Sequence, residues 1–452
     1  MLGPIGNRRL PWIFFGGLSI LGGCTRGSEH ALPAASRPCE IALTPLTGDA
    51  TLDKRIAQLQ EQARASPNSI IELERVGWLL VAKARKTFDA GYYKLAQQCA
   101  LCMEARQPHR AETMLLSGHV LDSLHHFKEA EAVARELVRL RGRSFDYGLL
   151  GDALMEQGKL ALAVDAYQKM IDQKPTPEAY SRAAHMRWLK GDLRGATQLM
   201  EMVAGAGDSD DPESSAWARV RLASYRLQAG DPHRASALIQ AALELEPGYP
   251  PALLAQGRLR LAEGDATGSI DPLRRAAQSN PLPEYQWALI EALRASGRTA
   301  DADAVQTQLF ARGAADDPRT YALYLATMER DTPTALRLAA QELHTRADVF
   351  TFDTLAWAQA AAGNLVEAQR EMQSALAEGT QDARLFLHAG VISARSGQTR
   401  AARTWLLKAR ALQTMLWPSE RAQLERQLAA LGTNSDPLSQ QAQPRKQEGK
   451  RS

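Results

Sequence analysis

The sequence carries almost no excess charge of either sign. It has 54 Lys and Arg against 51 Asp and Glu, giving a formal net charge of +3, and no basic cluster stands out in its body. Nucleic-acid-binding domains usually gather Lys and Arg on one face. We therefore expect no nucleic-acid partner.

Catalytic motifs are missing as well. The chain contains no Gly-x-Ser-x-Gly, no P-loop, no His-Glu-x-x-His and no glycine-rich dinucleotide-binding turn. It also leaves no block large enough for a catalytic domain, because a repeated pattern uses most of its length. The sequence predicts a protein that is not an enzyme and that needs no cofactor.

Runs of β-branched residues are few, whereas Ala and Leu dominate. This composition favours a chain that is nearly all helix. At 452 residues the chain is too long for one ordinary compact core. An array of repeats escapes that limit, because each unit packs only on its neighbours.

The only strongly apolar run is short and lies at the N-terminus. Arg8 and Arg9 precede an apolar stretch from Leu10 to Gly23, which at 14 residues is too short to span a bilayer comfortably. This pattern predicts a cleaved signal peptide over residues 1–23. The stretch ends Leu21-Gly22-Gly23-Cys24, that is, a leucine and two small residues before a cysteine.

That ending resembles the lipobox of bacterial lipoproteins. The resemblance implies that Cys24 is acylated and that the mature chain is anchored through its acyl chains to a membrane, on the periplasmic side of a bacterial envelope. Thr25 follows the cysteine where an Asp would favour the inner membrane, so the resemblance favours the outer one. An ordinary signal peptide with a chance cysteine is the alternative.

Two polar segments flank the body of the chain. Residues 24–50 are rich in Pro, Ser, Thr, Ala and Gly, which predicts a lipidated N-terminus and a flexible tether. Residues 433–452 carry little apolar content, which predicts a disordered polar tail. The folded part is therefore expected over residues 51–432.

Within this body the sequence repeats itself. Gly230, Gly264 and Gly297 are spaced 34 and 33 residues apart, and Ala130, Ala163 and Ala196 are spaced 33 and 33. In the unit 144–176, Gly151 would let two helices cross closely, Gly158 would end the first helix with a positive φ, and Pro175 would end the second.

This period and these residues resemble the tetratricopeptide repeat. The resemblance implies an all-α, right-handed α-solenoid of about ten helix-turn-helix units, with capping helices near residues 52–65 and 419–431. A seven-residue extension is expected around residues 85–91. The units begin near Ile70, Ala111, Ser144, Pro177, Ala216, Pro250, Pro283, Asp316, Val349 and Ala383.

Cysteines and histidines leave several interpretations open. Cys99 and Cys102 form a CxxC, and Cys39 lies in the tether; structural packing, a disulfide, or a metal or redox role are all considered. His119, Asp122, His125 and His126 lie close together in the sequence. We interpret them as a solvated surface, with a metal site as the alternative.

The tryptophans and several arginines are the candidate binding residues. Counted from the first residue of each unit, they fall at first-helix positions that usually face the concave groove of this family, where they would contact a partner. Tryptophan and arginine also dominate binding hot spots. The alternative is that the tryptophans pack between adjacent first helices. The candidates are Trp78, Trp188, Trp217, Trp287, Trp357, Arg258, Arg294, Arg384 and Arg395.

The family resemblance implies a membrane-anchored periplasmic scaffold or adaptor that binds proteins or extended peptides in its groove. Envelope assembly, secretion and polysaccharide export are all compatible with it. The alternative is a lipoprotein that binds glycan or peptidoglycan, with sugars stacked on the groove tryptophans.

Overall fold

The computed structural model describes residues 37–48, 50–206 and 211–433. All regular elements within these ranges are helices, which confirms the all-α prediction. Residues 1–23, Cys24 and the tail from residue 434 lie outside the described residues. In the part of the chain that is described, no helix is both long enough and apolar enough to cross a membrane.

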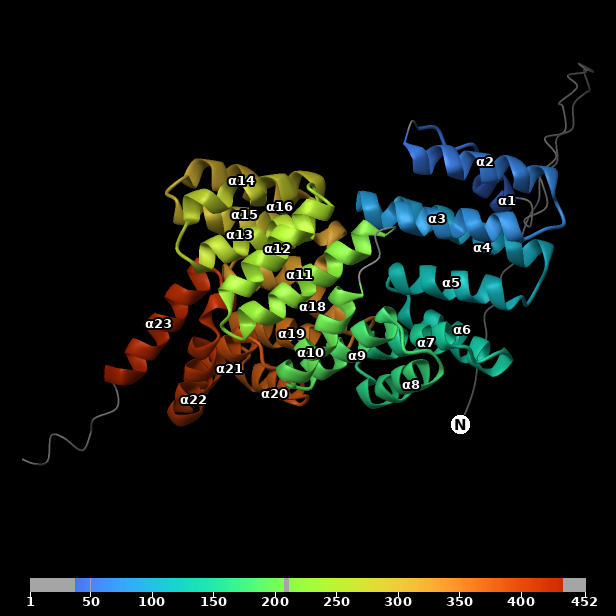
Figure 1. The fold of residues 1–452 in the computed structure, drawn as a ribbon. Coiled ribbons are helices and arrows are strands. Elements are labelled where there is room, and N and C mark those ends of the chain that lie inside the picture. The colour runs from blue at the N-terminus through green and yellow to red at the C-terminus, as the bar shows by residue number, and fades with distance from the viewer. Residues whose placement is uncertain (1–36, 49, 207–210, 434–452) are drawn as a thin grey trace, which may run out of the picture.

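Within the described ranges, twenty-three α-helices and one short 3-10 helix follow one another (Figure 1). Their bounds are α1 Arg37–Leu43, α2 Thr51–Ala65, α3 Ile71–Thr87, α4 Gly91–Arg106, α5 Ala111–Ser123, α6 Phe127–Leu140, α7 Ser144–Glu156, α8 Leu160–Gln173, α9 Pro177–Leu189, α10 Leu193–Gly205, α11 Pro212–Gln228, α12 Pro232–Leu245, α13 Pro250–Ala262, α14 Ala266–Ser279, α15 Pro283–Ala295, α16 Thr299–Asp316, α17 Pro318–Thr327, α18 Thr332–Leu343, α19 Val349–Ala361, α20 Leu365–Leu376, α21 Ala383–Arg395, α22 Thr399–Ala411, η1 Gln413–Met415 and α23 Pro418–Thr433.

The helices form ten consecutive pairs, from α3 with α4 to α21 with α22. Helices α2 and α23 flank them close to the predicted caps. Seven of the predicted first helices begin at the expected residue, for example Ser144 in α7, Pro177 in α9 and Ala383 in α21. The long α3 ends at Thr87, within the predicted extension. The structure therefore confirms a tetratricopeptide-like solenoid.

Glycine at two places in the unit 144–176 is required by geometry. A Cβ on Gly151 would lie 2.3 Å from the Tyr167 ring, so only glycine lets α7 and α8 approach so closely. Gly158 has a φ of +70° in the turn between them. Residues other than glycine rarely adopt this left-handed backbone conformation. The two glycines set the helix crossing and the turn.

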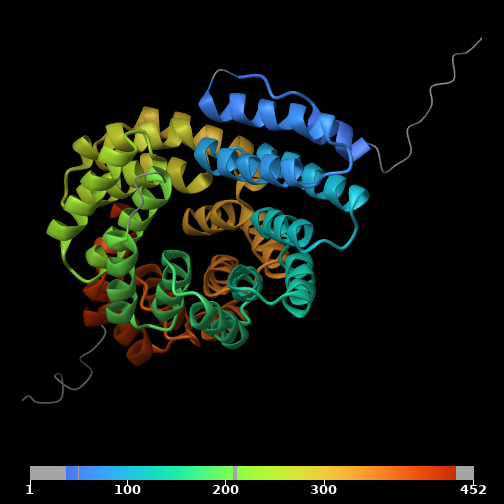
Figure 2. The ribbon, with the colours of Figure 1, turned by 45° about the vertical axis from the view of Figure 1, so that its right-hand side comes forward.

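The solenoid winds so tightly that distant units touch one another. In Figure 2 the pairs follow a ring, and the C-terminal helices continue behind the N-terminal ones. The amide of Ala347, before α19, donates to the carbonyl of Glu156 in α7 at 3.1 Å. The Arg421 guanidinium of α23 donates to the carbonyl of Leu261 in α13 at 2.6 Å. The second turn of the superhelix is thus stacked on the first.

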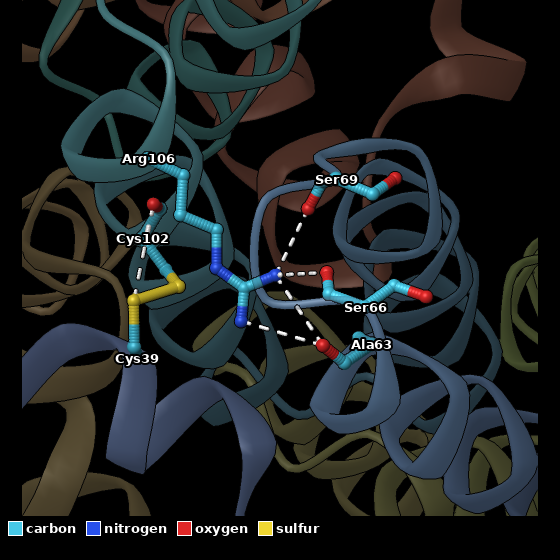
Figure 3. Close-up of a disulfide and its surroundings, with 6 residues drawn as sticks. All are labelled: Cys39, Ala63, Ser66, Ser69, Cys102 and Arg106. Carbon is cyan, nitrogen blue, oxygen red and sulfur yellow. Dashed lines mark hydrogen bonds between the residues drawn. A yellow bond between two sulfur atoms is a disulfide. The ribbon is translucent and has the colours of Figure 1, made fainter.

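Helix α1 lies inside the range 24–50, where a flexible tether was expected. It is part of the folded body, so for residues 37–48 that expectation is corrected. One physical reason is a disulfide between Cys39 and Cys102 of α4, with an S–S distance of 2.01 Å (Figure 3). The other is the buried Gln60 of α2. The Gln60 amide donates to the carbonyls of Ala42 at 2.9 Å and of Thr44 at 2.8 Å.

Arg106, one turn beyond Cys102, also ties the N-terminal helices together. Its guanidinium donates to the carbonyls of Ala63, Ser66 and Ser69 at 2.9–3.4 Å, which closes the end of α2 (Figure 3). Carbonyls at a helix C-terminus lack partners within the helix, so a cation there stabilises it. Of the alternatives left open for the cysteines, the structure contains a disulfide, but it does not join the two residues of the CxxC.

Candidate functional site

In five of the repeat units, the residue at the second position of the predicted unit lines a hollow of the solenoid. Phe145, Glu178 and Trp217 hold this place in α7, α9 and in the predicted unit that begins at Ala216, and all three line one cleft. Glu284 and Arg384 hold it in α15 and α21, and both line one inner cavity. The register of the repeat therefore selects the residues that a ligand would meet.

The largest of these hollows, about 620 Å³, is here called the aromatic cleft. It lies between α7, α9 and α11, and the C-terminal end of α3 contributes to it. Its walls combine exposed aromatic rings with small polar and charged side chains. They include Arg85, Phe145, Glu178, Ser181, Arg182, Glu213 and Trp217.

Two aromatic side chains in this cleft are open to solvent. Trp217 is 39% exposed and Phe145 is 50% exposed, although both are large and apolar. Trp217, one of the predicted groove residues, lines this cleft. Phe145 was missed, although it stands at the same register position of its unit; comparing units position by position would have found it.

Charged groups fix the shape of the cleft. Arg85 at the end of α3 reaches Glu213 of α11 at 3.3 Å, and this pair joins the first unit to the fifth across the cleft. Burial raises the pKa of Glu213, while Arg85 opposes the shift. Arg182 binds Asp152 at 2.6 Å on the opposite wall. The cleft thus offers both signs of charge beside its aromatic rings, which suits an extended peptide with mixed side chains.

Two smaller hollows lie deeper in the solenoid. The apolar cavity, about 260 Å³, lies between α11, α13 and the segment around η1. The arginine cavity, about 200 Å³, lies between α13, α15, α17, α19 and α21. Both are lined by Arg258, Glu284 and Trp417. Of the predicted groove residues, Arg258, Trp287 and Arg384 therefore come together here.

Two of the predicted groove tryptophans are buried. Trp287 is 2% exposed and Trp357 is 3% exposed, so neither can offer its ring face to a protein partner, and the prediction for them is corrected. Trp287 packs edge-on against Tyr324 with ring centroids 5.3 Å apart. Trp357 stacks on His388 at 4.1 Å. Both fill the space between adjacent first helices, as the alternative interpretation held.

Trp78 and Trp188 are half-buried, and each contacts other rings. Trp78 packs on His119 of the next unit, with centroids 5.3 Å apart. Trp188 stacks on Phe350 of α19 at 5.8 Å, and its indole Nε1 donates to Gln228 Oε1 at 2.8 Å. Trp188 therefore holds the two superhelical turns together, which leaves Trp217 as the most open of the five predicted tryptophans.

The other two predicted arginines lie away from these hollows. Arg294 donates to Gln306 Oε1 at 3.1 Å, and Arg395 donates to Glu329 Oε1 at 2.5 Å. Neither lines the aromatic cleft, the apolar cavity or the arginine cavity. Arg294 contacts the following helix and unit, whereas Arg395 reaches back to the two preceding units, where it also donates to the carbonyl of Ala360 at 3.2 Å.

The histidines named as possible metal ligands occupy an unusual electrostatic setting. No three His, Cys, Asp or Glu side chains within the described ranges are grouped so as to hold a metal ion. Burial raises the pKa of Asp122 to about 8, and the charges of Asp152 and Glu156 raise it further. Burial lowers the pKa of His119 to about 4. These groups make the wall of α5 sensitive to pH.

The remaining cysteine is chemically quiet. Cys99 is buried and unbonded, and its burial raises the pKa of its thiol to about 12. Thiols react as thiolates, so a thiol with so high a pKa is inert near neutral pH. The CxxC therefore offers no redox pair, because Cys102 is bonded to Cys39.

A known repeat family matches part of this architecture. A family model described as "Tetratricopeptide repeat" matches residues 115–178, 149–210 and 220–283. Among solved structures, that of pilF from Pseudomonas aeruginosa is 15% identical, over 44% of this chain and 90% of that one, with a TM-score of 0.38. The Cut9–Hcn1 hetero-tetramer of the APC/C is 13% identical, over 84% of this chain and 90% of that one, with a TM-score of 0.36. The sequence matches no curated protein.

The matched residues cover units whose helix pairs, turn glycines and concave register have been described above. Repeats of this kind generally serve as non-catalytic scaffolds that bind protein partners. Residues 115–210 and 220–283 match tetratricopeptide repeats, and the helix pairs on either side extend the same architecture into a longer solenoid.

Proposed function

We propose that this protein is a membrane-anchored scaffold of the bacterial envelope, and that it receives an extended segment of a partner protein in the aromatic cleft. The observation that carries the proposal is the pair Phe145 and Trp217. Both are large apolar side chains left exposed at the same register position in one cleft of about 620 Å³. Rigid aromatic rings supply contact area at a small cost in conformational entropy.

The polar groups around the two rings support a peptide as the ligand. Ser181, Glu178 and Arg182 lie on the α9 wall, and Arg85 and Glu213 close the far side. Donors and acceptors of both kinds can pair with the backbone of an extended chain. Glycan binding, the alternative, could not use Trp287 or Trp357, because both are buried, and would depend on Trp217, which stays exposed.

Changes in the cleft test this function. We expect Trp217→Ala and Phe145→Ala each to weaken partner binding by about 2 kcal/mol, the scale of an interface hot spot. The readout is recovery of crosslinked partners from intact envelopes, followed by affinity measurement with the partner identified. Val366, 75% exposed on α20 and outside the cleft, provides the control Val366→Ala. Unchanged affinity in both cleft variants would contradict the proposal, and binding to peptidoglycan fragments alone would favour the glycan alternative.

The location belongs to the same proposal. Leu21-Gly22-Gly23-Cys24 is the sequence support for lipidation, and Cys24 lies outside the described residues. The Cys39–Cys102 disulfide is an independent support, because such bonds persist mainly in oxidising compartments such as the periplasm. We expect the outer membrane as the anchoring surface.

Lipidation can be tested separately from partner binding. A fatty-acid analogue should label the wild type, and Cys24→Ala should abolish the label and release the protein from membranes or stall its processing. Several acyl chains anchor a protein stably, at about 0.8 kcal/mol for each buried methylene. A wild type that takes up no label would overturn the membrane anchor and leave the cleft proposal standing.

A further inference from the structure

The apolar cavity has the composition of a small-ligand site. Its walls are mostly aliphatic and come from α11, α12, α13 and the segment around η1, with Leu227, Ile239, Leu254 and Met415 among them. The cavity holds about 260 Å³ of space that no described side chain fills. Pockets for small molecules are typically apolar, with a few polar groups that orient the ligand.

Two hydrogen-bond donors at this cavity have no acceptor among the described residues. They are Nε of Arg258 and Nε1 of Trp417, and both atoms are buried. Trp417 as a whole is 3% exposed. The Arg258 guanidinium lies 4.3 Å from the centre of the Trp417 ring, so the two donors belong to neighbouring groups. Buried donors nearly always find an acceptor, and one left without a partner costs about 1–3 kcal/mol.

The charges at this cavity favour an anion. Arg221 and Arg258 line it against one carboxylate, Glu284, which accepts from Arg258 at 3.1 Å. Arg221 forms no ion pair with any described residue, and its guanidinium lies 6.0 Å from the centre of the Tyr225 ring. One positive charge is therefore left over beside an apolar space. Burial lowers the pKa of Arg258, and the carboxylates of Glu284, Glu420 and Asp382 oppose the shift.

We propose that the apolar cavity binds a small apolar carboxylate, whose chain lies among the aliphatic walls and whose carboxylate accepts from Arg258 and Trp417. A carboxylate has enough lone pairs to accept from both donors at once. Hydrogen bonds that involve an ion are also the stronger ones. Such a ligand would bind apart from the aromatic cleft, so this site does not depend on the function proposed there.

Calorimetric titration of the full mature chain tests the site with two matched probes, octanoate and 1-octanol. They share an eight-carbon chain and differ in charge. We expect octanoate to bind the wild type at least about tenfold more tightly, since a charge-assisted hydrogen bond contributes about 1.5–3 kcal/mol. Arg258→Met retains an unbranched side chain like the aliphatic part of arginine but removes the hydrogen-bond donors and the charge. It should therefore abolish the preference for octanoate over octanol.

Trp417→Phe is the second variant, because it keeps a ring beside Arg258 and removes only the indole N–H. We expect it to weaken octanoate binding about threefold and to leave octanol unchanged. Arg330→Met is the control: its guanidinium lies 4.7 Å from the Phe310 ring and outside the cavity, so both affinities should stay at the wild-type value.

The same titrations can overturn the proposal. It fails if the wild type binds neither probe up to their solubility limits, or if it binds octanol as tightly as octanoate. It also fails if Trp417→Phe and a folded Arg258→Met both bind octanoate like the wild type. None of these results bears on partner binding at Trp217, so failure here and failure of the scaffold proposal are distinguishable.

Discussion

The two halves of the solenoid are built from the same repeat but differ in how their hydrophobic cores are organised. In the C-terminal half, buried side chains from Leu253 to Leu431 form one continuous core. In the N-terminal half, the core is divided into smaller clusters, such as the one from Ala42 to Val120 and the one from Ala134 to Leu189. A continuous core leaves little inner space, whereas a divided one leaves room for a wide cleft.

The difference comes from what stands at the concave positions. In the C-terminal half these positions carry Trp287, Phe350 and Trp357, and the segment around η1 adds Trp417 from the next turn. In the N-terminal half the small side chains of Ser181 and Ser214 line the cleft and do not fill it. Trp287 and Ser181 both stand at the fifth position of their units, so one register position can supply either a core residue or a residue of the cleft wall.

The largest expected effect comes from truncating a buried side chain in the C-terminal half. Trp287→Ala should lower the free energy of unfolding by about 3–5 kcal/mol, as for other large-to-small core substitutions. The matched change Trp217→Ala, in the cleft, should cost under about 1 kcal/mol, because that side chain is 39% exposed. Urea denaturation followed by circular dichroism measures both. Equal losses in the two variants would abolish the distinction between a structural and a binding tryptophan.

The next effect should be confined to the N-terminal end. Replacing Cys39 and Cys102 together with alanine removes a link across 63 residues and should cost about 2–4 kcal/mol. Because units in a solenoid rest mainly on their neighbours, hydrogen exchange should speed up in α1 to α4 and stay unchanged in α15 to α22. Faster exchange throughout the chain would show that the two halves fold as a single cooperative unit.

A smaller effect concerns how the stability of the N-terminal half depends on pH. The folded-state pKa of Asp122 is raised to about 8 from a reference of 3.8, so the folded chain holds an extra proton between these values, and stability falls as the pH rises. The pKa values of His119 and His185 are lowered from 6.5 to about 4 and about 3, so their contribution rises with pH below 6.5 and is constant above it.

Asp122→Asn isolates the acid. Between pH 6.5 and 8 the wild type should lose up to about 1.4 kcal/mol per pH unit through this group, and the variant should lack that slope. Chemical denaturation at pH 6.5, 7.25 and 8 gives the comparison. Parallel slopes for the two proteins would mean that Asp122 is ionised in the folded state across the whole range.

The sequence predicted what depends on local chemistry. The turn glycine Gly158 and the prolines Pro177 and Pro250 act within their own units, so the unit boundaries follow from them. The stacking of α19 on α7, or of α23 on α13, depends on small rotations added over many units, and no local pattern records it. The pairing of Cys39 with Cys102 depends on α1, which lies where the composition predicts a flexible tether, and for this reason it was not predicted. The burial of Trp357 between adjacent first helices was only the alternative interpretation, because the register alone does not distinguish a packed tryptophan from an exposed one.

The smallest expected effect compares one turn position in the two halves. Glu329 and His125 stand where other units have a glycine, and their φ values are 47° and 64°. This left-handed conformation costs an L-residue about 1–2 kcal/mol, of which the greater chain entropy of glycine cancels about 0.5–1. Glu329→Gly should therefore stabilise the protein by about 0.5 kcal/mol, since the ion pair it gives up with Arg395 is largely exposed and contributes little.

His125→Gly should stabilise the protein less, because it also loses the stacking of His125 on Phe127, with ring centroids 5.5 Å apart. Thermal unfolding of both variants tests the order, and a destabilised Glu329→Gly would show that the pair with Arg395 outweighs the backbone strain.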